Sequence, residues 1–593
     1  MAKTNKDYII FDQAPTITFT CNEPIHDWYM GASHYSEKPR INGTITTSNC
    51  KADFILLGIP AEIRIRGNYT ADYSKKPFQI KFAEKENLFG LNNGNSHKKW
   101  ILLTEYTGGD MLRNATAFYM AQQIYKDTNV WVPTFTYAHF YIQDTENLYY
   151  MGLFLLTDQK EQAKKRVNVF EPEDGYEGTD IGYFFERDDY YQASDDPTFM
   201  LWDNAFFGRD FKPVGPIKTK HESNNWARQR DGIKLYGDGF SIKNKITNDA
   251  QVTYLKERVK KVYEVMYRAI YNAEYYEINE NNELVPSELT TTQEVLSKTI
   301  NIKSFVDRYI LEELVCNPDL AHSSFYFTLD MSEQGDKLVS LACPWDYDRG
   351  YGLTNGFAND PEAAGLWAKE CTLGWWISML ANTDWFTDLV KARWQELYDS
   401  YFMRKVLNLQ DDYCQAYVQD FARNYDEWDI YWGENKTWTV YDDQGKIIIP
   451  NDITIHQDFI TEADYKAMLQ TWVDDRMKTL HQLFDGQGST DWPEPPDPPD
   501  PPGPEPPEPG DASIFRKDKL VKHYTEETWN QMYNNAAKHA DELTKLWNMI
   551  YSSKSNKAVL FYNKMYMAVA SGKSLSDPDL QAELRAWNAQ AAR

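Results

Sequence analysis

The chain has 593 residues, with 62 Lys and Arg against 88 Asp and Glu, which gives a formal net charge of −26. Its content of 42% hydrophobic and 15% aromatic residues is typical of a folded protein with more than one domain, and it excludes a disordered chain. The negative charge argues against nucleic acid or an anionic membrane as the main partner.

The sequence shows no membrane or export signal. The apolar run near the start spans four residues, shorter than the core of a signal peptide, and no stretch approaches the roughly 18 apolar residues of a membrane helix. We therefore expect synthesis in the cytoplasm. The six cysteines are scattered without zinc-site spacing. Either a Cys21–Cys50 disulfide or unpaired, small apolar side chains would fit them.

The N-terminal part reads as strands, from alternating apolar residues at 15–19, 52–57, 61–66 and 78–82. The last two strands place Arg66 and Lys81 on a common side, with Lys75 and Lys76 in the turn between them. A group of cations in an acidic protein is a candidate polyphosphate site. A solvated basic face is the alternative.

Further elements are predicted as far as residue 314. Asp110 is a plausible N-cap for the helix that begins there. Residues 181–240 combine a short strand with an irregular, Gly- and Asp-rich excursion. The predicted elements are a helix at 110–125, strands at 134–142, 149–157 and 182–186, and helices at 252–271 and 302–314.

The next segment carries two groups of carboxylates at strand ends. Asp319 lies in a loop before a strand at 325–329, and the apolar run 338–343 leads to Asp346 and Asp348. Phosphoryl transfer uses such a pair, with one carboxylate orienting the hydroxyl and the other holding the metal on the nucleotide phosphates. Two Asp-rich surface turns are the alternative.

The C-terminal part combines aromatic helices (373–402), a helical pair (461–484) and a Pro-rich, acidic run at 493–509. That run predicts an extended polyproline spacer of roughly 50 Å at about 3.1 Å per residue. Beyond it, residues 512–593 predict a small helical module, whose third helix has Pro578 in its first turn. Such a module on a spacer favours attachment to a partner.

The order of strands, helix, strands, helices and Asp loops is that of a protein kinase, although G-x-G-x-x-G, HRD and DFG are missing. Residues 10–485 resemble the spore-coat protein H (CotH) kinases, which are atypical protein kinases. The resemblance is carried by RIRGNYTADYSKKPFQIKF at 64–82, MLRN at 111–114, YMGLFLLTD at 150–158, GYFFE at 182–186, NPD at 317–319 and PWDYD at 344–348.

The resemblance implies an α+β, kinase-like fold of two lobes. Residues 1–160 would form an N-lobe with a mixed or antiparallel sheet, and residues 161–486 a mainly helical C-lobe. Residues 487–511 would be the linker, and residues 512–593 the C-terminal module.

The resemblance also implies transfer of the γ-phosphate of ATP to Ser or Thr of a protein, with Mg²⁺ or Mn²⁺. Asp319 would be the catalytic aspartate and Asp346 the metal ligand, and Asp348 would either lie behind the metal ligands or help to hold a second metal. The implied phosphate contacts are Arg66, Lys76 and Lys81, and Asp158 falls where a hinge to adenine would lie. The substrate would be a coat or surface protein, reached through the C-terminal module.

Two positions depart from the family pattern. Ser324 stands where the family has a metal-binding Asn, and Asp158 stands where it has Glu. A hydroxyl can still ligate a metal, so Ser324 remains a metal candidate. The alternative is a pseudokinase that serves as a structural component of a spore coat, phage virion or surface complex. Carbohydrate binding by Trp428, Trp432 and Trp438 is a further alternative, against which core packing weighs.

Overall fold

The computed structural model describes most of the chain up to the Pro-rich run and part of the C-terminal region beyond that run. The described residues are 8–34, 36–106, 108–188, 196–201, 229–230, 233–234, 239–317, 320, 323–352, 365–370, 375–428, 440–441, 447–448, 462–495, 542, 545–546, 561, 565, 568–569 and 573–591.

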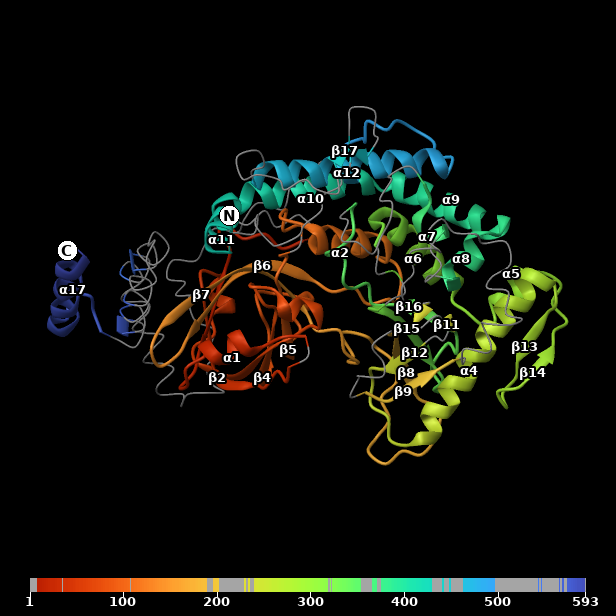
Figure 1. Ribbon diagram of the computed structural model, residues 1–593, viewed down its shortest axis with the longest axis horizontal. Coiled ribbons are helices and arrows are strands. Elements are labelled where there is room, and N and C mark those ends of the chain that lie inside the picture. The colour runs from red at the N-terminus through yellow and green to blue at the C-terminus, as the bar shows by residue number, and fades with distance from the viewer. Residues whose placement is uncertain are drawn as a thin grey trace, which may run out of the picture.

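The N-terminal part folds into a closed seven-stranded barrel in the order β1-β2-β3-β4-β5-β7-β6 (Figure 1). Most neighbours are antiparallel, and the parallel pair β1–β6 closes the barrel, with Thr16 beside His139. The strands are β1 (Thr16–Thr20), β2 (Ile41–Ser48), β3 (Ile59–Ile65), β4 (Phe78–Glu86), β5 (His97–Leu103), β6 (Phe135–Gln143) and β7 (Leu148–Asp158).

The barrel interior is filled by the apolar residues that alternate along its strands. Phe78 packs against Phe140 and Phe154, with ring centroids 5.0 and 5.8 Å apart. Ile63 and Ile80 are fully buried in the same cluster. A barrel of this size is a packed core and not a channel.

The predicted α+β class is confirmed, and the mixed sheet expected in residues 1–160 is present as a closed barrel. Closure depends on the pairing of β1 with β6, which are far apart in sequence. The expected strand at 52–57 is wrong, since Ala52–Phe54 form a 3₁₀ turn, η1. Two further turns are η2 (Tyr69–Asp72) and η3 (Asn92–Gly94).

The second part contains a five-stranded sheet in the order β16-β15-β8-β12-β9. The mainly helical part expected at 161–486 thus also contains a sheet. The strands are β8 (Gly182–Arg187), β9 (Thr198–Met200), β12 (Gly239–Ile242), β15 (Phe325–Asp330) and β16 (Ser340–Ala342). Every described pairing in this sheet is antiparallel. Strands β8 and β12 begin and end the region expected to be an irregular excursion.

In the view of Figure 1 most helices lie above this sheet and the barrel, and α4 lies beside the sheet. The expected helix 252–271 is α4 with a π-helical last turn, Arg268–Asn272, and the expected pair at 461–484 is one helix, α12. The helices are α1 (His26–Gly31), α2 (Arg113–Ile124), α4 (Asp249–Tyr267), α5 (Thr292–Leu296), α6 (Ile302–Val315), α7 (Trp367–Glu370), α8 (Trp375–Ala381), α9 (Asp384–Asp399), α10 (Phe402–Ala416), α11 (Val418–Trp428) and α12 (Glu462–Leu483).

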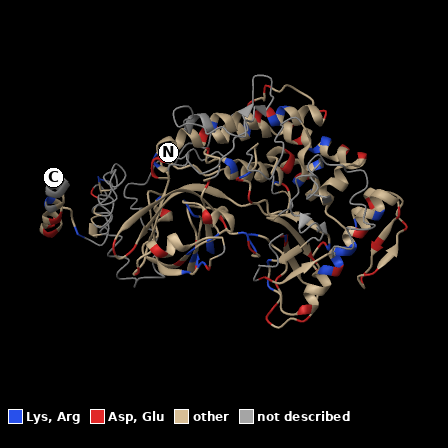
Figure 2. Cartoon of the chain, viewed as in Figure 1, with Lys and Arg blue, Asp and Glu red and all other residues tan. Residues whose placement is uncertain are grey.

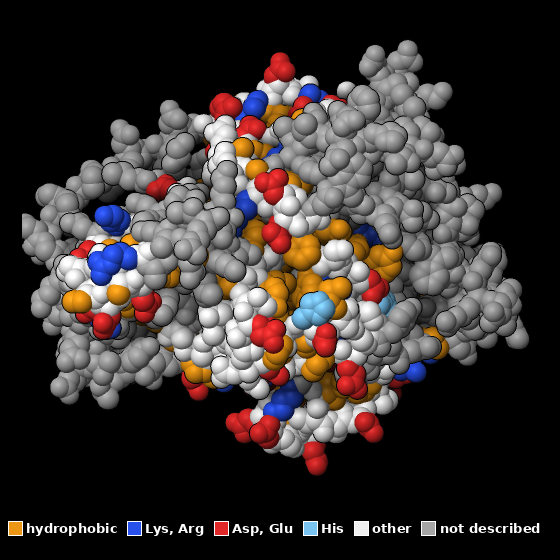
Figure 3. Space-filling model, turned by 60° about the vertical axis from the view of Figure 1, so that its left-hand side comes forward, with side chains coloured by type: hydrophobic (Ala, Val, Ile, Leu, Met, Phe, Trp, Pro, Cys, Tyr) orange, Lys and Arg blue, Asp and Glu red, His pale blue; other side chains and the backbone are white. Residues whose placement is uncertain are grey.

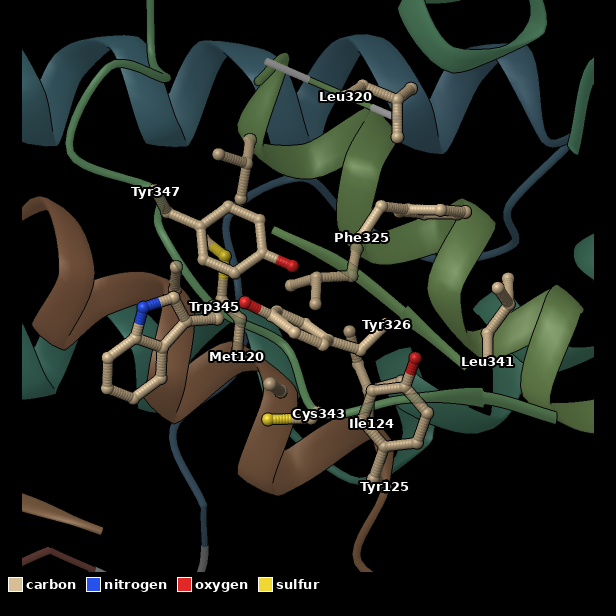
Figure 4. Packing of buried hydrophobic residues seen from close by; sticks show 14 of the residues in the cluster. Met120, Ile124, Tyr125, Leu320, Phe325, Tyr326, Leu341, Cys343, Trp345 and Tyr347 are labelled. Carbon is tan, nitrogen blue, oxygen red and sulfur yellow. The ribbon is translucent and has the colours of Figure 1, made fainter. Parts of the chain in front are cut away.

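A continuous core joins the two parts around α2. Phe118 of α2 contacts Phe135 of the barrel and Trp345 beyond the second sheet, at 6.1 and 5.7 Å between centroids. Figure 4 shows the rings of Trp345, Tyr347 and Tyr326 gathered above α2. The segment that carries the predicted carboxylates is thus anchored on the helix that also supports the barrel.

The remaining elements are small. They are the ribbons β10 (Gln229–Arg230) with β11 (Ile233–Lys234), β13 (Tyr276–Ile278) with β14 (Leu284–Pro286) and β17 (Val440–Tyr441) with β18 (Ile447–Ile448), and the C-terminal helix α17 (Pro578–Ala591). Helix α17 begins at Pro578, as expected. The linker 487–511 is described only up to residue 495, and of 512–573 only single residues and short pairs are described.

Acidic and basic residues are distributed along both described parts of the chain (Figure 2). On the face in Figure 3, Asp and Glu are scattered among hydrophobic side chains. Trp428 is half-buried, and its indole N–H donates to the carbonyl of Met151, while Trp432 and Trp438 lie outside the described residues. Among the described helices, none is long and apolar enough to cross a membrane.

Candidate active site

The site lies where the loops after β16 and before β15 face the barrel. Ser324 precedes β15, and its hydroxyl donates to Oδ2 of Asp346 over 2.9 Å. The amide of Asn317 donates to the backbone carbonyl of Asp346 over 3.2 Å. Two of the predicted oxygen ligands, Ser324 and Asp346, are thus adjacent, and both are half-buried.

The backbone here is held in an unusual conformation. Ser324 has φ of +55° and Asp346 has φ of +72°, in the left-handed region that side chains other than Gly rarely adopt. Cys316, Cys343 and Tyr351 of the surrounding loops also have positive φ values. Such residues persist only where surrounding contacts fix them, and they gather at functional sites.

Asn114 at the start of α2 fixes the loop after β16 that carries Asp346 and Asp348, called the carboxylate loop below. Its side-chain oxygen accepts the backbone N–H of Tyr347 over 2.8 Å, and its side-chain nitrogen donates to Glu105 over 2.6 Å. Burial raises the pKa of Glu105 to about 8, although the hydrogen bonds from Asn114 oppose the shift. The buried chain from Glu105 through Asn114 to Tyr347 therefore holds the residue between Asp346 and Asp348.

Two cations face this loop from the barrel. Arg66 follows β3, and its guanidinium carbon lies 5.8 Å from the ring centroid of Trp345. Lys160 follows β7, and its Nζ lies 5.4 Å from the same ring and 4.3 Å from that of Tyr326. Both residues are half-buried, and burial lowers both pKa values, while the Asp346 carboxylate opposes the shift. The aromatic rings support both cations.

Glu186 of β8 contacts Ser324, and its charge acts on both Arg66 and Lys160. One of its carboxylate oxygens accepts the backbone N–H of Ser324 over 2.7 Å, and the other pairs with Lys243 at 3.0 Å. Lys243 also pairs with Asp196 at 2.9 Å. Burial opposes ionisation of Lys243, but these carboxylates raise its pKa overall. Glu186 therefore fixes Ser324 and is itself neutralised.

The other lysines of the predicted cluster lie elsewhere. Lys76 is buried, and its Nζ donates to the backbone carbonyls of Ala32 and Ala71. Lys81 is paired with Glu62, the residue opposite it on β3, at 3.2 Å. The neighbouring Lys75 is buried and donates to the carbonyls of Thr104 and Leu153. Of the three predicted phosphate contacts, the structure brings only Arg66 to the carboxylate loop.

Asp158 has a dense set of structural contacts at the end of β7. Its two oxygens accept hydrogen bonds from Asn92, from the backbone and hydroxyl of Thr134, and from two guanidinium nitrogens of Arg166. Both Asp158 and Arg166 are buried. These contacts engage both carboxylate oxygens, so the Asp158 side chain stabilises the end of the barrel.

Asp319 lies outside the described residues, and its predicted role stays a prediction. Asp348 is half-buried, and its charge acts on both Arg66 and Glu105. Among the described residues, no group of three or more His, Cys, Asp or Glu could hold a metal ion. The donor chemistry of Ser324, Asp346 and Asp348 nonetheless fits a hard divalent cation, because it consists of hydroxyl and carboxylate oxygens only.

Sequence reasoning missed the roles of Glu105, Asn114, Lys160, Glu186 and Lys243 in this site. Asn114 and Glu186 stand in motifs of the family resemblance, but no role follows from the residues alone. One sequence feature could have indicated the position of Lys160: it comes two residues after a strand whose end was expected at the site. No sequence feature indicates the role of Lys243, because its partners lie on other segments.

The fold and the site define an α+β protein with a carboxylate loop opposite two cations, an arrangement whose charge suits a metal-bound phosphate ligand. The model of the family described as CotH kinase protein matches residues 63–480 of the chain. This match spans more than half of the chain and includes every site residue named above. The chain therefore belongs to the CotH kinase family. No curated protein matches it.

Proposed function

We propose that the chain is a metal-dependent protein kinase that transfers the γ-phosphate of ATP to Ser or Thr of a protein. One observation carries the proposal: the hydrogen-bonded pair of Ser324 and Asp346 faces the cations Arg66 and Lys160 at the junction of barrel and sheet. Oxygen ligands for a metal opposite cations for phosphate are the parts that phosphoryl transfer requires.

The roles of the residues follow from their chemistry. Asp346, with Ser324 and Asp348, would hold Mg²⁺ or Mn²⁺, which when bound bridges the phosphates and neutralises their charge. Arg66 would contact the phosphates, and its half-buried position strengthens that interaction because less water screens it. Asp319, in the loop before Ser324, would orient the hydroxyl of the substrate.

We further infer that the barrel serves as the nucleotide-facing lobe of a kinase and that the second sheet with its helices serves as the other lobe. The substrate would be a coat, surface or other structural protein. The module at 512–593 would bring it to the site, because the Pro-rich, acidic composition of the run before it favours an extended spacer.

The test is phosphate transfer from γ-³²P-ATP by the purified chain to itself and to a generic Ser/Thr protein substrate, with Mg²⁺ or Mn²⁺. Asp346→Asn keeps the shape of the side chain and removes its charge, so transfer should fall by at least about a hundredfold. Asp388→Asn on the exposed face of α9 is the matched control and should transfer normally. Equal labelling by Asp346→Asn and the wild type would refute the proposal.

A second candidate, a pseudokinase that acts in assembly, is favoured by one contact. The Ser324 hydroxyl donates to Asp346 Oδ2 and occupies an oxygen that a metal would use. This candidate predicts no transfer and no rise in melting temperature with Mg·ATP. A rise that disappears in Asp346→Asn would contradict it.

A further inference from the structure

Within the described part of the chain, Lys160 and Arg66 are cations without a polar partner. The Nζ of Lys160 and the guanidinium of Arg66 have no hydrogen-bond acceptor and no carboxylate within ion-pair distance there, and their close contacts are aromatic rings. Lys75, Lys76, Lys81 and Lys243 all have such partners. A half-buried cation without an acceptor is costly unless a ligand supplies one.

The two cations share one support. Trp345 lies 5.8 Å from the guanidinium carbon of Arg66 and 5.4 Å from Nζ of Lys160, measured to its ring centroid. They come from different strand ends of the barrel, after β3 and after β7. Trp345 immediately precedes Asp346, so the two cations converge on the residue that would hold the metal.

The acidic neighbours do not satisfy Lys160. Glu186 acts on its charge, but the oxygens of Glu186 are engaged by Lys243 and by the N–H of Ser324. Asp346 likewise acts on Lys160 from a distance while it accepts the hydroxyl of Ser324. Lys160 thus lies near two carboxylates that have other partners and near the like charges of Arg66 and Lys243, the state expected of a group that awaits an anionic ligand.

We propose that Lys160 is the lysine that binds the donor phosphates, paired with Arg66 across Trp345, in the place that the sequence assigned to Lys76 or Lys81. This inference rests on the proposed kinase function for its ligand, the polyphosphate of a nucleoside triphosphate. An ammonium contacts phosphate as a point charge, and a neighbouring guanidinium adds a planar pair of donors.

The test measures the affinity for inorganic tripolyphosphate by calorimetric titration without metal. ATP kinetics are measured beside it. Lys160→Met keeps the aliphatic chain over Tyr326 and Trp345, and it should weaken tripolyphosphate binding at least about tenfold. The same variant should bind adenosine as the wild type does. Lys160→Arg should restore a large part of the affinity. Lys164→Met, exposed in the same connecting segment, is the matched control and should bind normally.

The outcomes separate this inference from the kinase proposal. Weaker tripolyphosphate binding by Lys160→Met supports it even when the wild type transfers no phosphate, a result that would count against the kinase proposal alone. Equal tripolyphosphate binding by Lys160→Met and the wild type overturns it, whatever the transfer rate. A wild type that binds no tripolyphosphate overturns it as well. Circular dichroism of each variant checks that the fold is retained.

Discussion

Replacement of Ser324 tests whether its hydroxyl is a metal ligand. Ser324→Ala removes the oxygen that contacts Asp346, and Ser324→Asn introduces an amide oxygen in its place. Neither change touches the backbone N–H that donates to Glu186. The φ of +55° favours Asn, which adopts the left-handed region several-fold more often than most residues. The Asn variant should therefore fold without added strain.

The magnitude follows from the contact itself. A hydrogen bond to a charged group contributes about 1.5–3 kcal/mol net, and the half-buried position of Ser324 favours the lower end. About 1.5 kcal/mol corresponds to roughly a tenfold change in a dissociation constant. Ser324→Ala should therefore weaken Mn²⁺ binding about tenfold in the presence of ATP. Ser324→Asn should bind Mn²⁺ at least as tightly as the wild type, because carbonyl oxygens are good ligands for hard cations.

The assay is titration of Mn²⁺ followed by the electron paramagnetic resonance signal of the free ion, with a non-hydrolysable ATP analogue present. It needs no phosphate transfer, so it also applies to a pseudokinase. Ser297→Ala, an exposed serine at the end of α5, controls for the loss of a hydroxyl elsewhere. Unchanged or tighter Mn²⁺ binding by Ser324→Ala would show that the hydroxyl only blocks Asp346, and it would refute the reasoning.

Two further predictions concern buried carboxylates. Asp158→Ala should lower the unfolding free energy by about 3 kcal/mol, because the buried Arg166 loses one of its two carboxylate partners and the Thr134 N–H loses its acceptor. Urea unfolding followed by tryptophan fluorescence, to which Trp100 under Arg166 contributes, measures this loss, and a value below about 1 kcal/mol contradicts the prediction. Burial raises the pKa of Glu105 to about 8, above its unfolded value of about 4.3, so the unfolded state loses this proton first and stability should fall as pH rises between these values. The slope from this one group is about 1.4 kcal/mol per pH unit, and Glu105→Gln should remove it; identical pH profiles of stability for the variant and the wild type would disprove the assignment.

Much of the local structure could be predicted from the sequence. The alternation of Ile63 and Ile65 with Arg64 identifies β3, and the periodicity of 302–314 identifies α6, because both patterns are carried by neighbouring residues. The resemblance to CotH kinases also placed Asp346 and Ser324 in one site, where the structure joins them by a hydrogen bond.

Partners across strands and segments could not be predicted in this way. Lys81 looked available in a single strand, but the register places Glu62 opposite it. Lys76 looked exposed in a polar turn, but that turn folds back so that its Nζ meets two backbone carbonyls. Barrel closure and the position of Lys160 both depend on pairings between distant segments, which no short pattern encodes.

The closing pair of the barrel has a consequence for folding. Strand β1 can pair with β2 early, since Thr16 lies beside Ser48, but its second neighbour is available only when His139 of β6 has been synthesised. Contacts so distant in sequence form slowly, and a nascent chain exposes the apolar inner faces of β1 to β5 in the meantime. A chain interrupted before β7 carries Arg66 without Lys160. Both barrel cations are thus present only in a chain that has grown past the last barrel strand.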